Sequence, residues 1–486
     1  MPLRVLSRDA TWLLPPDLDE LIGQNHAARY VATFVDDTLE RRDWLAMGIA
    51  LDGEPLGASA YDPRGLLAVW LYGFMTGVRS TRQLERACRE NLAYLWLTGW
   101  QHPDHSTLWR FYQANRQGMR ELFTKSVKTA VQAGLVDLAV QAVDGTKVAG
   151  NAARKHTLKA VEVRRLLERV EGAITELEAQ NSGGDEPAPA QLPVVLANRQ
   201  ALREKLRQAK AAIEHADGPQ ETNLTDGDAT IMKTQQGYVA GYNAQAMVAP
   251  VNPLVGGGSG FLITAADVGT NANDSAQLEP MVQQAQDTVG QPAALTLADG
   301  GYHSGANLAA MATRGQTLVM PAVHRGTTSL YDKDAFAYDA EHDQYTCPQG
   351  QVLRFGGTIT RQHELPVRRY RAEPTICHAC PVRKHCTTNR RHGRTLEVTQ
   401  HEPHLHRHRA WMASETAKGA YRQRQQLVEP VFGILKECQQ ARRFLLRGLH
   451  NVQAEWSLLA TTFNLRTLCR VWQRQAGNRA LAGVLV

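Results

Sequence analysis

Two apolar, strand-like runs that each end in Asp-Gly constrain the fold of this chain more than any other feature. The first run covers residues 135–144 and ends at Asp144, and the second covers residues 294–299 and ends at Asp299. Because functional groups gather at strand ends in open α/β sheets, we expect both carboxylates at one edge of a sheet. Two converging carboxylates repel one another unless a cation neutralises them, and hard oxygen ligands suit Mg²⁺ or Mn²⁺. The alternative for each residue is an ordinary turn aspartate before glycine.

A third acidic residue, Glu429, lies within residues 421–436, which are patterned as a helix. Pro430 either kinks this helix or marks its first turn. The neighbours of Glu429 are apolar, so we expect its charge to be paired or bound to a metal ion. Arg424 and Lys436 would lie within about two helical turns of it and could offer positive charge to a phosphate. Salt bridges on the helix surface are the alternative for these two cations.

The first part of the chain, residues 16–135, is patterned as helices without a clear alternating strand. Residues 80–88 begin a helix at a hydroxyl cap, and residues 107–113 form a second helix. The pair is similar to an elaborated helix-turn-helix, in which the second helix would enter the DNA major groove. The alternative is a plain helical bundle with Trp109 and Phe111 in its core.

Two further helices are predicted by apolar residues at steps of three and four within residues 158–177 and 195–216. A flexible loop rich in Gly and Pro, residues 180–189, joins them. Two such helices joined by a loop form an antiparallel helical hairpin inserted into the core. Its role is either accessory packing or that of an arm for dimerisation or DNA contact.

After residue 222 the strand pattern returns, with strand-like runs at residues 238–248 and 261–267. A helix is predicted over residues 275–289, and another follows Ser304. These elements predict an α/β core with a mixed sheet flanked by helices.

Four of the seven cysteines cluster in a segment with few apolar residues for a core: Cys347, Cys377, Cys380 and Cys386. Tetrahedral Zn²⁺ bound by four thiolates would stabilise such a small insertion. An iron-sulfur cluster uses the same ligands, and unligated thiols are the remaining alternative. His378 and His385 are fallback ligands. Basic residues are densest between residues 361 and 409, so we expect this module to contact the DNA backbone.

The composition is that of a soluble globular protein, with 43% hydrophobic and 21% charged residues among 486. The formal net charge of +6 suits a polyanionic partner without establishing one. We find no signal-peptide pattern at the start of the sequence, and the longest apolar run, residues 65–78, is too short to cross a bilayer. A cytoplasmic protein is therefore expected, in which seven cysteines would not form a disulfide scaffold.

The motifs, taken in order, resemble the DDE transposases of bacterial insertion sequences, specifically those with a Tyr-Arg-Glu-Lys signature around the acidic helix residue. The resemblance spans nearly the whole chain. It rests on Pro-Asp-His-Ser-Thr at 103–107, Val-Asp-Gly-Thr-Lys at 143–147, Gly-Tyr-Val-Ala-Gly-Tyr-Asn-Ala-Gln at 237–245, Asn-Ala-Asn-Asp-Ser at 271–275, Ala-Asp-Gly-Gly-Tyr at 298–302 and Val-Glu-Pro-Val-Phe-Gly at 428–433.

This resemblance implies an RNase H-like core in which three residues are catalytic and hold Mg²⁺ or Mn²⁺: Asp144, Asp299 and Glu429. It implies DNA contacts, to phosphates or a flipped base near the element's end, by the signature residues Tyr421, Arg424 and Lys436. We expect further DNA contacts from Lys147, Thr107 and Arg110. One departure concerns spacing, because four residues separate Arg424 from Glu429 where the family usually has three.

The implied activity is binding of the element's terminal inverted repeats, metal-dependent cleavage there, and joining of the ends to target DNA. A homodimer or larger assembly is expected, because two ends must be paired. The alternatives are a nuclease with the same core but no strand transfer, and a DNA-binding protein that has lost catalysis.

The domain organisation predicted from these patterns has five parts. They are a helical DNA-binding domain over 1–134, a core over 135–156 and 222–328, a helical hairpin over 157–221, a basic four-cysteine insertion over 329–400, and C-terminal helices over 401–486 that complete the core.

Overall fold

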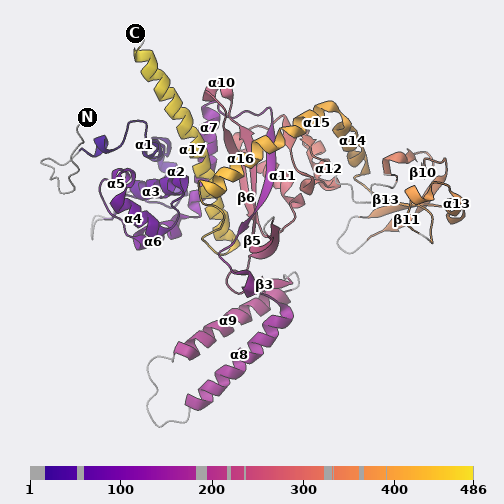
Figure 1. Ribbon diagram of the computed structural model, residues 1–486, viewed down its shortest axis with the longest axis horizontal. Helices are drawn as coiled ribbons and strands as arrows, with labels where there is room; N and C mark the ends of the chain where they lie inside the picture. The colour runs from indigo at the N-terminus through magenta and orange to yellow at the C-terminus, as the bar shows by residue number, and fades with distance from the viewer. Residues whose placement is uncertain are drawn as a thin grey trace, which may run out of the picture. The chain divides into compact units, whose positions relative to one another are not determined.

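The computed structural model describes residues 17–51, 60–181, 194–215, 220–234, 237–321, 331, 333–360, 366–389 and 391–484. The chain divides into two compact units (Figure 1). The first comprises Met1–Asp137, Gly145–Ala272 and Glu429–Val486, and the second comprises Leu138–Asp144 and Asn273–Val428. Strand β1 (Gln141–Ala149) and helix α16 (Arg424–Glu437) each begin in the second unit and end in the first.

The N-terminal part of the first unit is helical, as its sequence predicts. Its helices are α1 (Ala27–Thr33), α2 (Arg41–Ala46), α3 (Pro63–Thr76), α4 (Thr81–Glu90), α5 (Leu92–Leu97), α6 (His105–Asn115) and α7 (Glu121–Gln132). Helix α3 is the apolar run that was too short for a membrane span, and every residue from Leu66 to Met75 is buried. This helix begins at the Asp62 cap and ends at Gly77, which adopts a left-handed conformation that glycine tolerates best.

The first unit also contains an antiparallel set of strands. They are β4 (Thr230–Thr234), β5 (Gly237–Pro250) and β6 (Phe261–Gly269), with the short helix α10 (Pro253–Gly256) between the last two. Strand β5 pairs with β4 on one side and with β6 along most of its length. The second half of β1 also lies beside β5, and Gly150 N–H donates to the carbonyl of Ala240 at 2.9 Å.

The long helix α17 (Leu449–Val484) packs against β6, α3 and α7 in this unit. It carries buried polar residues that hold neighbouring backbone in place. Asn464 accepts from Ile263 N–H at 2.8 Å and donates to the Ile263 carbonyl at 2.9 Å, so it pairs with strand β6 as another strand would. Fixing β6 in this way orients the antiparallel sheet on the helical core.

Two long helices occupy the segment where the sequence predicts a helical hairpin. Helices α8 (Ala160–Asn181) and α9 (Val194–Glu214) lie side by side (Figure 1). They are flanked in the sequence by β2 (Thr157–Lys159) and β3 (Glu221–Asn223), which pair with each other. They share a core of their own: Val163, Leu167, Val170, Ile174, Leu206 and Ala209. The connection predicted over residues 180–189 lies mostly outside the described residues.

The second unit contains the parallel part of the sheet. The first half of β1 pairs in parallel with β7 (Leu295–Leu297), which pairs in parallel with β8 (Thr317–Val319). The helices of this unit are α11 (Leu278–Val289), α12 (Gly305–Thr313), α14 (Glu402–Ala413) and α15 (Glu415–Arg422). Parallel and antiparallel pairs are thus both present, as expected for an α/β core with a mixed sheet.

The four-cysteine segment forms a small antiparallel sheet in the second unit, visible in Figure 1 around β10, β11 and β13. Its strands, in spatial order, are β13 (Thr395–Thr399), β12 (Val367–Ala372), β11 (Val352–Ile359), β10 (Gln344–Thr346) and β9 (Ala337–Asp339), and helix α13 (Pro374–Ala379) follows β12. One face of this sheet is apolar, and its buried residues are Phe336, Tyr345, Leu353, Tyr370, Ala372, Leu396 and Val398. Within the described ranges of the chain, every helix is too short or too polar to span a membrane.

Candidate functional site

Asp144 lies within strand β1 and not at its end. The Gly145 that follows it was expected to terminate the strand, but β1 continues to Ala149. The strand continues because its later residues stay paired, as the hydrogen bond from Gly150 N–H to the Ala240 carbonyl shows. The side chain of Asp144 remains 20% exposed, so it is accessible from solvent.

Asp299 lies just past the end of strand β7, as its sequence context predicts. Its carboxylate accepts a hydrogen bond from Gly301 N–H at 2.8 Å and caps the turn that follows. The register of the sheet relates the two aspartates, because Ala142 of β1 pairs with Leu297 of β7 in parallel. Each aspartate is the second residue after this pair, so both occupy the same position along neighbouring strands.

One cation, Arg424, lies close to both carboxylates. Its Nη2 atom lies 2.9 Å from Asp144 Oδ2 and 4.0 Å from Asp299 Oδ2. The side chain of Arg424 is only 11% exposed, and its Nε has no hydrogen-bond partner among the described residues. From the sequence we expected Arg424 to face phosphate, whereas in the structure its charge neutralises the aspartate pair.

Two residues of this site were missed in the sequence analysis. Tyr302 is fully buried, and its pKa is raised well above its ordinary value, first by burial and then by the charges of Asp274, Asp144 and Asp299. Arg424 opposes this rise. Asp274 is therefore a third carboxylate in this region. It belongs to the Asn-Ala-Asn-Asp-Ser motif, which contributed to the family resemblance and was the signal available for it.

Gly301 shows how closely these carboxylates approach the backbone. A Cβ atom at this position would lie 2.9 Å from Asp299 Oδ1 and 3.5 Å from Asp274 Oδ2. The first distance is shorter than carbon-oxygen contacts allow, so a side chain here would displace the Asp299 carboxylate. Gly301, the second of the two glycines after Asp299, therefore leaves room for the carboxylates of Asp299 and Asp274.

Residues 421–436 form parts of two helices, although the pattern predicted one. Helix α15 ends at Arg422 and α16 begins at Arg424, so Tyr421 lies on a different helix from the other signature residues. Pro430 lies inside α16. Glu429 is exposed on α16, so the expectation that burial forces its charge to be paired is wrong, because an exposed carboxylate remains hydrated.

Lys436, near the end of α16, is half-buried and donates from Nζ to Thr146 Oγ1 at 2.6 Å. Thr146 is two residues after Asp144 in β1, and side chains two apart on a strand share a face. Lys436 therefore contacts the face of β1 that carries Asp144. Lys147 is the next residue of β1, is half-buried, and projects to the opposite face.

Asp144 and Asp299 offer oxygen donors that suit a divalent ion. In the part of the chain that the structure describes, no three His, Cys, Asp or Glu side chains are gathered as a metal site. Asp144 and Asp299 nevertheless lie within ion-pair distance of one cationic nitrogen of Arg424. Two partly exposed carboxylates that already share a cation have the oxygen chemistry that Mg²⁺ prefers, so they fit such an ion once the guanidinium moves away.

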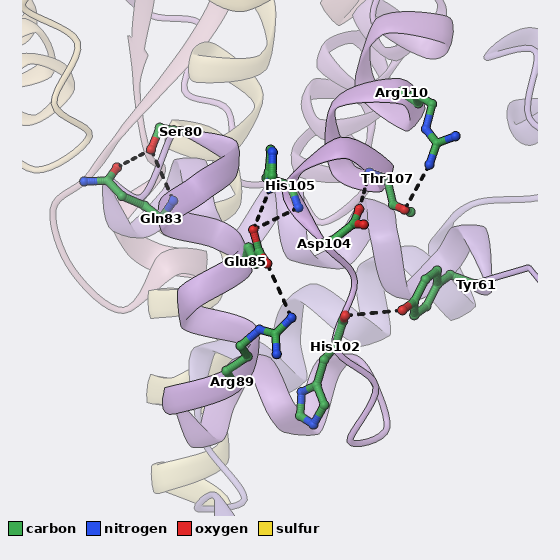
Figure 2. A network of polar contacts seen from close by, with 10 residues as sticks. All are labelled: Tyr61, Ser80, Gln83, Glu85, Arg89, His102, Asp104, His105, Thr107 and Arg110. Atoms are coloured by element: carbon green, nitrogen blue, oxygen red, sulfur yellow. Dashed lines mark hydrogen bonds and ion pairs between the residues drawn. The ribbon is translucent and has the colours of Figure 1, made fainter.

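The helices predicted to contact DNA are α4 and α6, with α5 between them in the sequence. Glu85 of α4 accepts from His105 N–H at 3.2 Å, and its Oε2 lies 2.8 Å from His105 Nδ1, which lowers the pKa of Glu85 (Figure 2). Thr107 and Arg110 follow on α6, and the exposed Arg110 bonds to the Ser106 carbonyl of its own helix at 3.3 Å. Trp109 is 39% exposed, so it does not belong to a bundle core as one alternative supposed.

The segment that holds strands β9–β13, from Ala337 to Thr399, is called the β module, and its four cysteines lie around one small cavity. Cys347 Sγ accepts from the N–H groups of Gln349 and Gln351 at 3.4 and 3.3 Å, and Cys377 Sγ accepts from Arg394 N–H at 3.4 Å. Burial raises the pKa of the Cys386 thiol, and the other three sulfurs contribute to the rise. Among the described residues, no group of three or more His, Cys, Asp or Glu side chains is gathered as a metal site, so zinc binding by the four cysteines stays a prediction.

Comparison with known families gives two matches on separate parts of the chain. The family described as "Transposase domain (DUF772)" matches residues 16–114, and the family described as "Transposase DDE domain" matches residues 346–469. The first match covers the N-terminal helices through most of α6, and the second covers the four cysteines and helix α16 with Glu429. A search of the curated proteins found no match.

Of the three predicted catalytic carboxylates, only Glu429 lies within a matched stretch. A DDE domain implies an RNase H-like fold, which agrees with the mixed sheet of this chain. DDE transposases generally use divalent metal ions such as Mg²⁺ and act on DNA. The chain is therefore similar to transposase families over two separate stretches, residues 16–114 and 346–469.

Proposed function

We propose that this chain is a metal-dependent DDE transposase of the Tyr-Arg-Glu-Lys type that binds the terminal inverted repeats of its element, cleaves DNA there and joins the ends to target DNA. One observation carries the proposal. Asp144 and Asp299 occupy equal positions on two parallel neighbouring strands and share one cation, Arg424. A pair of carboxylates arranged in this way is suited to holding divalent ions against a phosphodiester.

In this proposal Asp144 and Asp299 hold the catalytic Mg²⁺ or Mn²⁺ ions, and Glu429 completes the ligand set. The bound ions would activate the attacking hydroxyl and stabilise the departing oxygen in an in-line displacement. Asp274 lies in the same acidic region and has the same chemistry, so it is a further candidate for orienting the ligands.

Arg424, Lys436 and Tyr421 position the DNA in this proposal. Arg424 neutralises Asp144 while no divalent ion is present, and its planar guanidinium is free to bind a phosphate once an ion replaces it. Lys436 donates to Thr146 Oγ1 of β1, and its positive charge suits a DNA phosphate.

Binding of the terminal repeats is assigned to the N-terminal helices, with Thr107 and Arg110 on α6 as contacts and Lys147 of β1 as a further contact. The hydrogen bonds of Glu85 with His105 fix α4 against the start of α6, so the two helices present one surface. We propose a homodimer or larger assembly on DNA, because the two ends of an element must be brought together.

The test is cleavage and joining of a labelled duplex that carries the element's own terminal repeat, with Mg²⁺ and with EDTA. We expect cleavage at the repeat boundary only with the metal ion, and joining of a pre-cut end to a target plasmid. Cleavage without joining would support the nuclease alternative. Tight binding to the repeat with no cleavage in Mg²⁺ or Mn²⁺ would support a DNA-binding protein without catalysis.

We also propose that the four cysteines bind a structural zinc ion. The proposal is supported by the single cavity that they line and by the N–H groups directed at Cys347 and Cys377, since such donors stabilise thiolates.

Zinc removal is expected to unfold the β module, because its sheet has a small apolar core. We expect one zinc ion per chain by elemental analysis, and a chelator should lower the Tm of the module by roughly 5 °C or more. Cys380→Ser should lose the zinc ion, whereas Cys438→Ser, which changes an exposed thiol outside the cluster, should retain it. If the native chain contains no zinc and the chelator leaves its Tm unchanged, this proposal is contradicted.

A further inference from the structure

The five-stranded sheet of the β module has one covered face and one open face. Phe336, Leu353 and Tyr370 belong to the buried core on the covered face. The open face is defined by the cross-strand row of residues that pair directly with one another, because directly paired residues project to the same side. From β9 to β13 this row is Asp339, Gln344, Arg354, Arg371 and Thr395.

Two arginines stand directly opposite one another in the middle of this row. Arg354 of β11 pairs with Arg371 of β12, and both side chains are exposed. Like charges in this position destabilise a sheet, because paired side chains in neighbouring strands lie within about 5.5 Å at Cβ. Among the residues that the structure describes, neither arginine has a carboxylate partner.

The other charges on the open face are already compensated. Asp339 accepts from Gln344 and lies 2.8 Å from His342 Nδ1, and Glu397 on β13 accepts from Arg369 at 2.8 Å. The excess positive charge of the open face is therefore concentrated on Arg354 and Arg371.

A glycine next to the arginine pair leaves room for the Arg371 side chain. Gly356 of β11 follows Arg354 by two residues, and a Cβ there would meet the Arg371 side chain at 3.5 Å. The Arg371 chain therefore lies over a glycine, in a strand whose register shifts after Phe355. Two exposed arginines on directly paired strand positions present their charge together to a polyanion.

We propose that Arg354 and Arg371 form a binding surface for the phosphate backbone of duplex DNA, separate from the carboxylate site and from the N-terminal helices. The proposal rests on the proposed function, since that function supplies the DNA. Guanidinium groups bind phosphate oxygens through two parallel N–H donors, and a phosphate between them would remove their mutual repulsion. An acidic protein is the competing class of partner. It is less suited, because two of its carboxylates would have to be fixed at the spacing of the two arginines.

The test measures binding of the full chain to a fluorescent duplex of arbitrary sequence by anisotropy, over a range of salt concentrations. Arg354→Gln with Arg371→Gln should weaken binding roughly tenfold near 0.1 M salt and reduce the slope of log K against log salt by about 2. The Tm of the variant should equal or exceed that of the native chain, because the repulsion is gone. The Arg354→Lys with Arg371→Lys variant should keep most of the slope.

The matched control is Arg42→Gln with Arg314→Gln, which removes the same charge from two arginines that already have carboxylate partners. It should bind DNA almost as the native chain does. A native salt slope in the Arg354 and Arg371 double variant would overturn this inference alone. The double variant is also applied to a polyglutamate column. If it loses the retention of the native chain while its DNA binding is unchanged, the inference is overturned and an acidic protein is the partner. A native chain that binds no DNA would instead overturn the proposed function.

Discussion

Asp144→Asn and Asp299→Asn are each expected to lower the rate of DNA strand cleavage by roughly a thousandfold or more, equal to about 4 kcal/mol of transition-state stabilisation. The amide that replaces the carboxylate is neutral and binds a divalent ion poorly, so the site would lose charge and a ligand together. Glu429→Gln should have an effect of the same order if Glu429 completes the ligand set. The measurement is single-turnover cleavage of the terminal duplex at saturating Mg²⁺.

The variants should differ in stability although they agree in activity. Asp144→Asn leaves the mostly buried Arg424 without its partner at 2.9 Å, so in EDTA it should lose about 1–3 kcal/mol of unfolding free energy. Asp299→Asn should lose less, because its oxygen is 4.0 Å from Arg424 and its side chain is 37% exposed. Glu429→Gln should lose very little, since Glu429 is exposed.

The matched control for these substitutions is Asp287→Asn, which changes an exposed aspartate on α11 in the same way. It should cleave at the native rate. If Asp144→Asn or Asp299→Asn also cleaves at the native rate in saturating Mg²⁺, that residue is structural and the metal site must be assigned elsewhere. Equal Tm losses for Asp144→Asn and Asp299→Asn would show that Arg424 does not distinguish the two carboxylates.

The elements that position this site were predictable where the sequence pattern is local. Apolar periodicity predicted helices α8 and α9 and the helix at residues 275–289, and alternating or apolar runs predicted β5, β6 and β7. Asp299 follows its strand as predicted, and its side chain caps the turn that comes next. Such elements depend on neighbours in the sequence.

The contacts of the site depended on residues distant in the sequence, and these were not predictable. Gly145 looks like a strand end, but β1 continues because β5 supplies hydrogen-bond partners for its second half. Arg424 reaches Asp144 across some 280 residues of chain, and nothing local to either residue indicates the pair. Asp274 was visible only as part of a motif, since its nearness to Asp299 arises from folding.

Glu429 illustrates the limit of hydropathy as a guide to burial. Its neighbours Val428 and Val431 are buried, yet Glu429 itself is exposed on α16. A helix presents adjacent residues to different faces, so apolar neighbours in the sequence do not make a residue buried. The same helical geometry places Leu435 in the core and leaves Lys436 able to contact Thr146.

A buried ion pair that has no sequence signature gives the largest expected effect on stability. Arg79, between α3 and α4, is 4% exposed and pairs with Glu455 of α17, which is 1% exposed. Arg79 also donates to the Gln440 and Arg443 carbonyls, at 2.5 and 3.1 Å. Glu455 accepts from the N–H groups of Leu445 and Leu446 at 3.0 and 2.9 Å.

This network fixes the segment that follows α16 to the helical core of the first unit. Glu455→Gln is expected to lower the unfolding free energy of that unit by about 3–5 kcal/mol, because it leaves the Arg79 charge buried without a counter-charge. The measurement is a urea titration followed by circular dichroism, with the Mg²⁺-dependent cleavage rate recorded on the folded fraction. A loss below about 1 kcal/mol would show that water reaches Arg79 and that the pair is not buried in solution.

The double variant Arg79→Met with Glu455→Met separates the charge effect from packing. Removing both charges eliminates the uncompensated ion, so the double variant should be more stable than Glu455→Gln even though the Leu445 and Leu446 N–H groups lose their acceptor. If the double variant is the less stable of the two, the main contribution of Glu455 is its acceptance of these backbone donors. The pair would then act by holding the segment after α16 in its conformation. In that case the DNA cleavage rate should fall in proportion to the loss of protection of this segment's N–H groups from hydrogen exchange.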